Sequence, residues 1–499
     1  MNHTPKRAYP WQRRRRQVLL LVASLGVFVV FPLIAYRWTA SDRIREAFES
    51  ARAAKLPMSV KDLATWAPAQ AAKEDSEGTE AAAVAENPPG ADTASPAIPQ
   101  SPPPLPGGVQ VPGKTLAAAI PALYRLLSLP LETPEEMDSL RNLKKEPGTR
   151  RLEETERETL RKLLAGRQEA MRAVHEVSHR PPGRFPIDLS RGRNPDSSHV
   201  KAVAEVLRYL DYEARLEGED GNTDKAAEAL LTGFRVADTM RNEPVIYSHI
   251  FYCRCVANLA EALGHVLSRC TPADAQLAKL STAFAKAETP QTLTNALITE
   301  QAMGISLYDD PEFQRQITEG MHMPLDDYVP GATTLLMQGM GSLGRNDLDK
   351  ARYVRMMSGV IEASRHPAHE MTARVDGMIR GPWASQHWLP RPSDSLASAP
   401  WMIRAYAELL TTVRAGVIAS AMERYRLVGG FTPEYLDGLI PAFLDSIPLD
   451  PFDGKPLRFR RENADYLVYG IGINRTDDNG KSGDGPHRRT GDIVLRVEH

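Results

Sequence analysis

The stretch from Val18 to Tyr36 constrains this chain more than any other, because it contains no charged residue. At about 1.5 Å per helical residue it spans about 28 Å, close to the thickness of a bilayer's hydrocarbon core. The run Arg13–Arg16 precedes it, and basic clusters of this kind stay in the cytoplasm. The sequence therefore predicts a transmembrane helix over residues 18–36 behind a cytoplasmic basic N-terminus, residues 1–17.

A cleavable signal peptide is the alternative interpretation of this stretch. Signal peptides have a shorter apolar run that ends in a small-x-small cleavage site, whereas Arg37 and Trp38 follow Tyr36 here. The aromatic rings of Tyr36 and Trp38 are favoured at the membrane–water interface on the outer face of the membrane. We therefore expect a retained single-pass anchor in the cytoplasmic (inner) membrane of the cell, with the bulk of the chain extracytoplasmic.

The composition limits the class of protein. Hydrophobic residues make up 42% and charged residues 25% of the 499 residues, which is typical of globular domains. A net charge of -2 gives no sign of nucleic-acid binding. Three cysteines exclude a disulfide-stapled fold. Cys253 falls on an apolar helical stripe, so we expect a buried structural thiol there.

Two segments separate the anchor from the folded part. Residues 37–66 form a juxtamembrane segment that is expected to begin as a short helix. Residues 67–113 are rich in Ala, Pro, Glu, Ser and Gly and contain no aromatic residue, so they cannot bury enough apolar surface to offset the entropy of ordering. We expect a disordered linker that extends the reach of the folded part, the alternative being a merely tolerated spacer.

Helical periodicity dominates residues 114–392. Apolar residues recur at helical spacing, and Thr-Pro pairs at residues 271–272 and 289–290 mark helix starts. The segments 199–216 and 223–240 are similar to a tetratricopeptide hairpin, but its signature residues and a sustained repeat period are absent. The sequence therefore predicts an irregular, mainly α-helical domain.

The last segment, residues 393–499, changes pattern. A long amphipathic helix begins near Pro400 and stops at Gly429-Gly430, since glycine tolerates the left-handed geometry of a helix end. Three short strands are predicted at residues 457–461, 466–472 and 492–497. A helix packed on an antiparallel sheet buries the apolar faces of both, so we expect an α+β module.

This module resembles the soluble region of the major pseudopilins of type II secretion. The resemblance rests on the helix followed by Gly-Gly-Phe-Thr-Pro (429–433), on Pro-Leu-Asp-Pro-Phe-Asp-Gly-Lys-Pro (448–456), on Tyr-Gly-Ile-Gly (469–472) and on Asp-Ile-Val (492–494). It covers about residues 401–497 and implies a pseudopilin-like fold. The family's Gly-Phe-Thr-Leu-Ile-Glu processing site is absent here, so the resemblance does not extend to pilus assembly. The whole layout resembles membrane-anchored bacterial envelope proteins.

The resemblance also implies a calcium site, because these pseudopilins hold calcium between their last strands. The corresponding loop offers the hard oxygen donors that calcium prefers, from Asp477, Asp478, Asn479, Asp484 and Asp492. Three basic residues in the same loop, Lys481, Arg488 and Arg489, count against a cation. An ordinary solvated Asp/Asn/Gly loop is the alternative.

A second cluster, His366-Pro-Ala-His369-Glu370, is the one that invites a zinc interpretation. Its His-x-x-His spacing places both imidazoles on one helical face, but Pro367 makes His366 a helix boundary. The residue order also differs from the common zinc-protease motifs. A polar helix start is the alternative.

The sequence thus predicts a non-enzymatic scaffold or protein-interaction protein of the bacterial envelope, associated with secretion if the resemblance holds. Its expected partners are the membrane and unidentified proteins, and calcium is the one cofactor expected. An envelope hydrolase that uses His366, His369 and Glu370 at a metal is the alternative. A small-ligand sensor is a third hypothesis, for which the sequence indicates no pocket.

Overall fold

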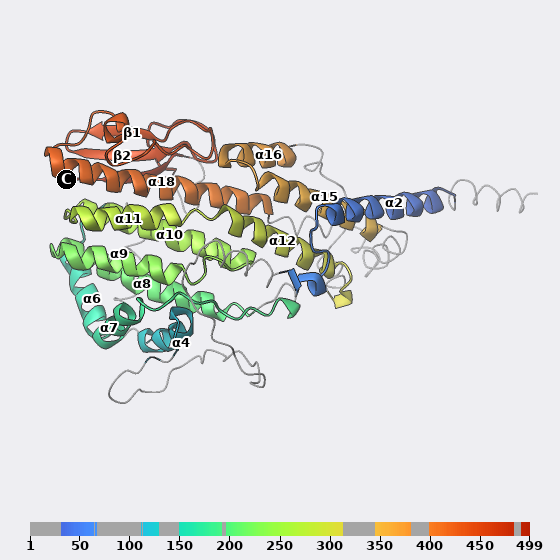
Figure 1. The fold of residues 1–499 in the computed structure, drawn as a ribbon, viewed down its shortest axis with the longest axis horizontal. Helices are drawn as coiled ribbons and strands as arrows, with labels where there is room; N and C mark the ends of the chain where they lie inside the picture. Colours follow the sequence, from blue (N-terminus) through green and yellow to red (C-terminus); the bar gives the residue numbers. More distant parts are fainter. Residues whose placement is uncertain are drawn as a thin grey trace, which may run out of the picture. The chain divides into compact units, whose positions relative to one another are not determined.

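A computed structural model describes residues 31–63, 65–66, 111, 113–128, 149–191, 196–312, 345–380, 399–483 and 491–499. Within these residues the protein is mainly α-helical, with a small three-stranded antiparallel sheet near the C-terminus (Figure 1). This confirms the predicted fold class at that level. Most of the predicted transmembrane helix (18–30) and of the predicted linker (67–110) lies outside the described residues.

Helix α2 (Phe31–Ala53) covers the last residues of the predicted span and the first part of the predicted juxtamembrane segment. Over the ranges described, no helix combines the length and the apolar character that crossing a bilayer requires.

The chain divides into two compact units, and the division falls within two helices, α12 (Pro290–Leu307) and α15 (Arg345–Ala363). The smaller unit contains residues 1–59, 301–359 and 386–397. Within it, the Tyr308 hydroxyl donates to Asp349 Oδ2 at 2.8 Å. Lys350 Nζ bonds both carboxylate oxygens of Asp309 at 2.9 Å. These bonds tie the end of α12 to the start of α15.

The larger unit contains residues 60–300, 360–385 and 398–499. Its helices stack in layers, with the sheet outermost on one side (Figure 1). In chain order they are α4 (Leu116–Leu127), α6 (Glu154–Ala165), α7 (Gln168–Val177), α8 (Ser198–Glu219), α9 (Thr223–Ala237), α10 (Ile246–Leu267), α11 (Asp274–Lys286), α16 (Ala368–Arg380) and α18 (Ala399–Gly429), with α12 entering from this unit.

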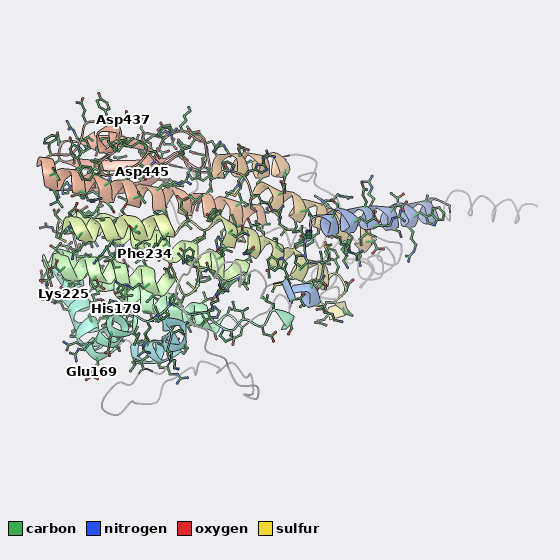
Figure 2. All side chains as sticks on the ribbon, in the orientation of Figure 1. Glu169, His179, Lys225, Phe234, Asp437 and Asp445 are labelled. Carbon is green, nitrogen blue, oxygen red and sulfur yellow. The ribbon has the colours of Figure 1, made fainter. Side chains whose placement is uncertain are left out.

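The predicted helix pair at residues 199–216 and 223–240 is present as α8 and α9, which pack against each other. In the core, the rings of Phe234 on α9 and Phe284 on α11 meet edge to face, 4.7 Å between centroids (Figure 2). Of the two Thr-Pro pairs, the one at 289–290 marks the start of α12 as predicted. Helix α11 begins later, at Asp274, because the N–H of Ala273 is capped by Gln276 Oε1.

The predicted C-terminal helix and strands are confirmed. Helix α18 ends at Gly429, and Gly430 has a φ of +74°, the left-handed geometry expected of that position. The strands β1 (Arg458–Glu462), β2 (Asp465–Gly470) and β3 (Ile493–Val497) form an antiparallel sheet in sequence order. Phe459 pairs with Val468, and Val468 pairs with Leu495.

The predicted boundary between residues 392 and 393 lies outside the described residues. Helix α18 packs on α10 and α11, and β3 also contacts α10. Residues 399–499 therefore belong to the same compact unit as helices α4 to α11.

Candidate functional site

The two residue clusters singled out in the sequence meet at one cavity of the larger unit. The cavity has a volume of about 470 Å³. It is lined by His369 and Ala373 of α16, by Phe452, Asp453, Lys455 and Arg458, and by Ile471, Arg475 and Asp477. His369 of the predicted zinc cluster and Asp477 of the predicted calcium loop therefore face the same space.

The wall between them is a turn built by residues 448–456. Asp450 Oδ1 accepts the N–H of Phe452 at 2.9 Å, and the N–H of Asp450 donates to the carbonyl of Lys455 at 2.6 Å. Asp453 Oδ1 accepts the N–H of Lys455 at 3.0 Å. Short acidic side chains commonly close turns in this way. The turn holds the side chains of Asp453 and Lys455 at the cavity.

Arg458, the first residue of β1, joins three carboxylates. Its Nη1 donates to Asp450 Oδ2 at 2.9 Å, its Nη2 to Asp453 Oδ2 at 2.7 Å, and its Nε to Asp477 Oδ2 at 3.0 Å. Burial lowers the pKa of Arg458, but the three carboxylates raise it by more than burial lowers it. The guanidinium therefore stays charged. This residue offsets part of the negative charge on the acidic side of the cavity.

Asp450 is the buried member of this group, with no exposed surface. Burial raises its pKa, and hydrogen bonds from Phe452 N and Ile471 N, together with the charge of Arg458, oppose that rise. Its Oδ2 accepts the N–H of Ile471 at 2.9 Å. Asp450 thus fixes the turn to the end of β2.

Arg475 closes the opposite side and adopts a φ of +56°. Its Nε donates to Asp376 Oδ2 at 3.1 Å, its Nη2 to Thr372 Oγ1 at 3.2 Å, and its Nη1 to the carbonyl of Phe452. Since Thr372 and Asp376 belong to α16, this one side chain connects the helix to the turn. A residue in this unfavourable backbone region persists where its surroundings hold it in place.

The predicted zinc residues point in different directions. His366 Nδ1 lies 3.6 Å from Glu370 Oε2, and its Nε2 lies 3.8 Å from Glu362 Oε1, on the surface of the α15–α16 corner. The ring of His369 packs instead on Gly454 of the turn, where a Cβ would lie 2.9 Å from its Cδ2. The structure therefore separates the two imidazoles of the His-x-x-His pattern.

The predicted calcium residues form a loop closed by Asp492, which is 3% exposed. Its Oδ2 accepts the N–H of Gly480 at 2.7 Å and its Oδ1 that of Asp478 at 3.3 Å. Asp477 Oδ1 accepts the N–H of Asn479 at 2.9 Å. Asp484 lies outside the described residues.

No group of three or more His, Cys, Asp or Glu side chains in the described ranges converges as a metal ion would require. Calcium binding by Asp477, Asp478, Asn479, Asp484 and Asp492 stays a prediction.

Sequence reasoning did not identify Asp450, Arg458, Arg475 or Asp376 as site residues. Asp450 lies within the Pro-Leu-Asp-Pro-Phe-Asp-Gly-Lys-Pro motif at residues 448–456, and Arg458 follows that motif. Acidic residues in a turn, followed by an arginine at the start of a strand, could have indicated this group of ion pairs. Nothing in the sequence pattern connects Asp376 to Arg475.

Comparison of the chain with models of protein families, with curated proteins and with solved structures gave no match. The resemblance of residues 401–497 to pseudopilins therefore stays a prediction. What the geometry offers chemically is a small cavity with an apolar floor, Phe452 and Ile471, and charged walls whose arginines are already bonded to carboxylates.

Proposed function

We propose that this chain is a non-enzymatic, membrane-anchored scaffold of the bacterial envelope, which binds other proteins outside the cytoplasm. The charge-free stretch at residues 18–36 behind a basic N-terminus supports the anchor and its orientation. The resemblance of residues 401–497 to pseudopilins supports partners that belong to a secretion machinery.

The observation that carries the binding role is the pairing of charges around the cavity. Arg458 bonds three carboxylates and Arg475 bonds Asp376, so these groups hold the shape of the cavity. A rigid cavity with an apolar floor and a charged rim suits recognition of a partner's side chain.

The proposal is tested in cells with a photocrosslinking amino acid in place of Ala373, which lines the cavity and is exposed. The matched control carries the same group in place of Lys279, an exposed residue of α11. We expect a discrete crosslinked protein from position 373 and none from position 279. Equal crosslinking from both positions would contradict binding at the cavity.

The location is tested separately. An alkaline phosphatase fused after residue 499 is active only outside the cytoplasm, so we expect activity in the membrane fraction. Recovery of an inactive fusion from the soluble fraction would overturn the proposed location and orientation.

A further inference from the structure

An exposed apolar patch lies where α18 ends and the chain enters the segment before the turn at residues 448–456. It comprises Leu427, Val428, Phe431, Tyr435 and Ile440. Val428 is 80%, Tyr435 68% and Phe431 59% exposed. Single exposed apolar residues are common on protein surfaces, whereas a cluster of large ones marks an interaction surface.

The patch is held together by Tyr425, around which the chain folds. The ring of Phe431 meets that of Tyr425 edge to face at 5.8 Å, and the ring of Phe443 meets it from another side at 6.0 Å. A Cβ at Gly438 would lie 3.9 Å from Tyr425 Cε2. Residues 429–443 therefore fold around the ring of Tyr425, and this contact positions Phe431 of the patch.

The residues that alternate with the patch are acidic. Between Leu427 and Gly454 the sequence contains no Lys, Arg or His. Glu434, Asp437 and Asp445 are exposed, and no ion pair joins them to any residue that the structure describes. Figure 2 shows Asp437 at the outer edge of the unit beside the sheet and Asp445 closer to α18, both far from Glu169 and His179.

The basic side chains close to the patch have partners elsewhere. Arg424 Nε donates to Asp274 Oδ1 at 2.7 Å, and Arg426 Nε donates to Glu423 Oε2 at 2.8 Å. Arg461 reaches the segment, where its Nη1 donates to the carbonyl of Thr432 at 3.4 Å. Arg424 also reaches the segment, since its guanidinium lies 5.4 Å from the centre of the Phe443 ring, but its charge is paired with Asp274. The three carboxylates therefore outnumber Arg461, the cation there that has no carboxylate partner among the described residues.

We propose that the apolar patch is a docking surface for an amphipathic segment of another protein, one whose apolar side chains are flanked by lysine or arginine. The partner's apolar residues would cover Val428, Phe431 and Tyr435, and its cations would face the acidic rim. Aromatic side chains that are held rigidly and surrounded by complementary charge are typical of binding hot spots. The proposal rests on the proposed function only in treating the chain as a binding protein.

Charge also argues against other occupants. In a symmetric contact with a second copy, the patch faces itself, so Glu434, Asp437 and Asp445 would approach their own counterparts. Anionic lipid headgroups would be repelled in the same way. The basic segment Arg13–Arg16 of this chain lies across the membrane in the proposed topology.

The test uses the full chain in nanodiscs of phosphatidylcholine and a labelled amphipathic peptide of leucine and lysine, about 18 residues long, or about five helical turns. Fluorescence anisotropy gives its dissociation constant. The matched peptide has glutamate in place of lysine. The variants are the double substitution Val428→Ser with Phe431→Ser, and the triple substitution Glu434→Gln, Asp437→Asn and Asp445→Asn. Trp401→Ser, an exposed aromatic at the other end of α18, is the control.

We expect the lysine peptide to bind at least ~10-fold more tightly than the glutamate peptide, and each variant to lose at least ~10-fold in affinity. Trp401→Ser should bind like the wild type. Because all substituted residues are exposed, unchanged thermal unfolding shows that each variant is folded. Equal binding of the two peptides, or equal loss in Trp401→Ser, would overturn the proposal.

Two further outcomes would assign the surface to another occupant and also overturn it. One is a dimer of the wild type that Val428→Ser with Phe431→Ser dissociates, as measured by analytical ultracentrifugation. The other is binding to anionic vesicles that the same variant abolishes. If crosslinks still form from position 373 in cells, the proposed function stands and only the docking surface is lost.

Discussion

Arg458 donates to the fully buried carboxylate of Asp450 at 2.9 Å, and this bond is one of those that tie the first strand of the sheet to the turn before it. Asp450 also accepts the N–H groups of Phe452 and Ile471. The buried carboxylate accepts three hydrogen bonds and is therefore satisfied. Without it, each of the three N–H groups would lose this acceptor. This relationship makes the turn and the cavity depend on a single side chain.

Asp450→Ala should therefore lower the free energy of unfolding by about 3–5 kcal/mol, because it leaves one N–H of the Arg458 guanidinium and two buried backbone N–H groups without an acceptor. Urea titration followed by circular dichroism measures the change. Asp445→Ala removes an exposed carboxylate nearby and should change the free energy by less than about 0.5 kcal/mol. Equal effects of the two substitutions would show that Asp450 does not hold the turn.

Two glycines offer a matched test of how His369 packs. Gly454 and Gly430 both have a φ of +74°, but a Cβ at Gly454 would lie 2.9 Å from His369 Cδ2, and a Cβ at Gly430 would meet nothing within 4 Å. Each Gly→Ala substitution costs about 1–2 kcal/mol for the left-handed backbone alone. Gly454→Ala should lower the unfolding midpoint more than Gly430→Ala does. Adding His369→Ala to Gly454→Ala should remove that difference, and failure to do so would show that the imidazole packs elsewhere.

The loop at residues 477–492 is predicted to be closed without a metal. Because Asp492 accepts the N–H groups of Gly480 and Asp478, Asp492→Ala should cost about 1–3 kcal/mol even in the presence of a chelator. Urea titration in EDTA measures this. An unchanged midpoint would mean that the carboxylate does not close the loop.

The calcium hypothesis makes a different prediction for the same loop. A bound ion stabilises the folded state by mass action, so calcium should raise the melting temperature of the wild type. Asp477→Asn with Asp484→Asn should abolish that rise, since both residues are predicted ligands. A melting temperature that does not respond to calcium in differential scanning calorimetry would remove calcium from the description of this loop.

Much of the fold could be predicted because its signals are local. The apolar spacing of α10, the glycine pair after α18 and the alternation in the three strands each depend on residues close in sequence. The cavity could not be predicted in the same way. His369 and Asp477 meet because α16 packs on α18 and Arg475 bonds Asp376. A periodic pattern shows which face of a helix is buried but not which partner covers it, so the packing of α18 on α10 and α11 was not evident from the sequence either.

The three cysteines should differ in reactivity. Cys253 and Cys255 are buried, and burial raises the pKa of both thiols, that of Cys255 to about 12. Cys270 is partly exposed, although burial raises its pKa as well. Because the thiolate is the reactive form, a chromogenic disulfide reagent should modify only Cys270 in the folded protein, and slowly. Cys270→Ser should then leave no reaction before unfolding, and rapid modification of that variant would contradict the burial of the other two.

Acid should weaken the larger unit through His249. This imidazole is 1% exposed and lies between the rings of Tyr406 and Tyr252, at 5.6 Å and 6.4 Å, and neither of its nitrogens has a hydrogen-bond partner among the described residues. Burial lowers its pKa from 6.5 to about 4. The unfolded chain therefore binds a proton below pH 6.5 that the folded chain binds only below about pH 4.

The contribution of the neutral imidazole to the free energy of unfolding is therefore fully present above pH 6.5 and is lost as the pH falls toward 4. The total loss is about 3 kcal/mol. His249→Leu removes this proton linkage and two unsatisfied nitrogens, so the variant should unfold with a weaker dependence on pH. The measurement is urea unfolding of both proteins at about pH 7, 5.5 and 4. Because other acidic groups titrate equally in the two proteins, the difference between them isolates His249. If the two free energies fall in parallel with pH, the imidazole is protonated equally in the folded and unfolded states, and its burial has no effect on acid stability.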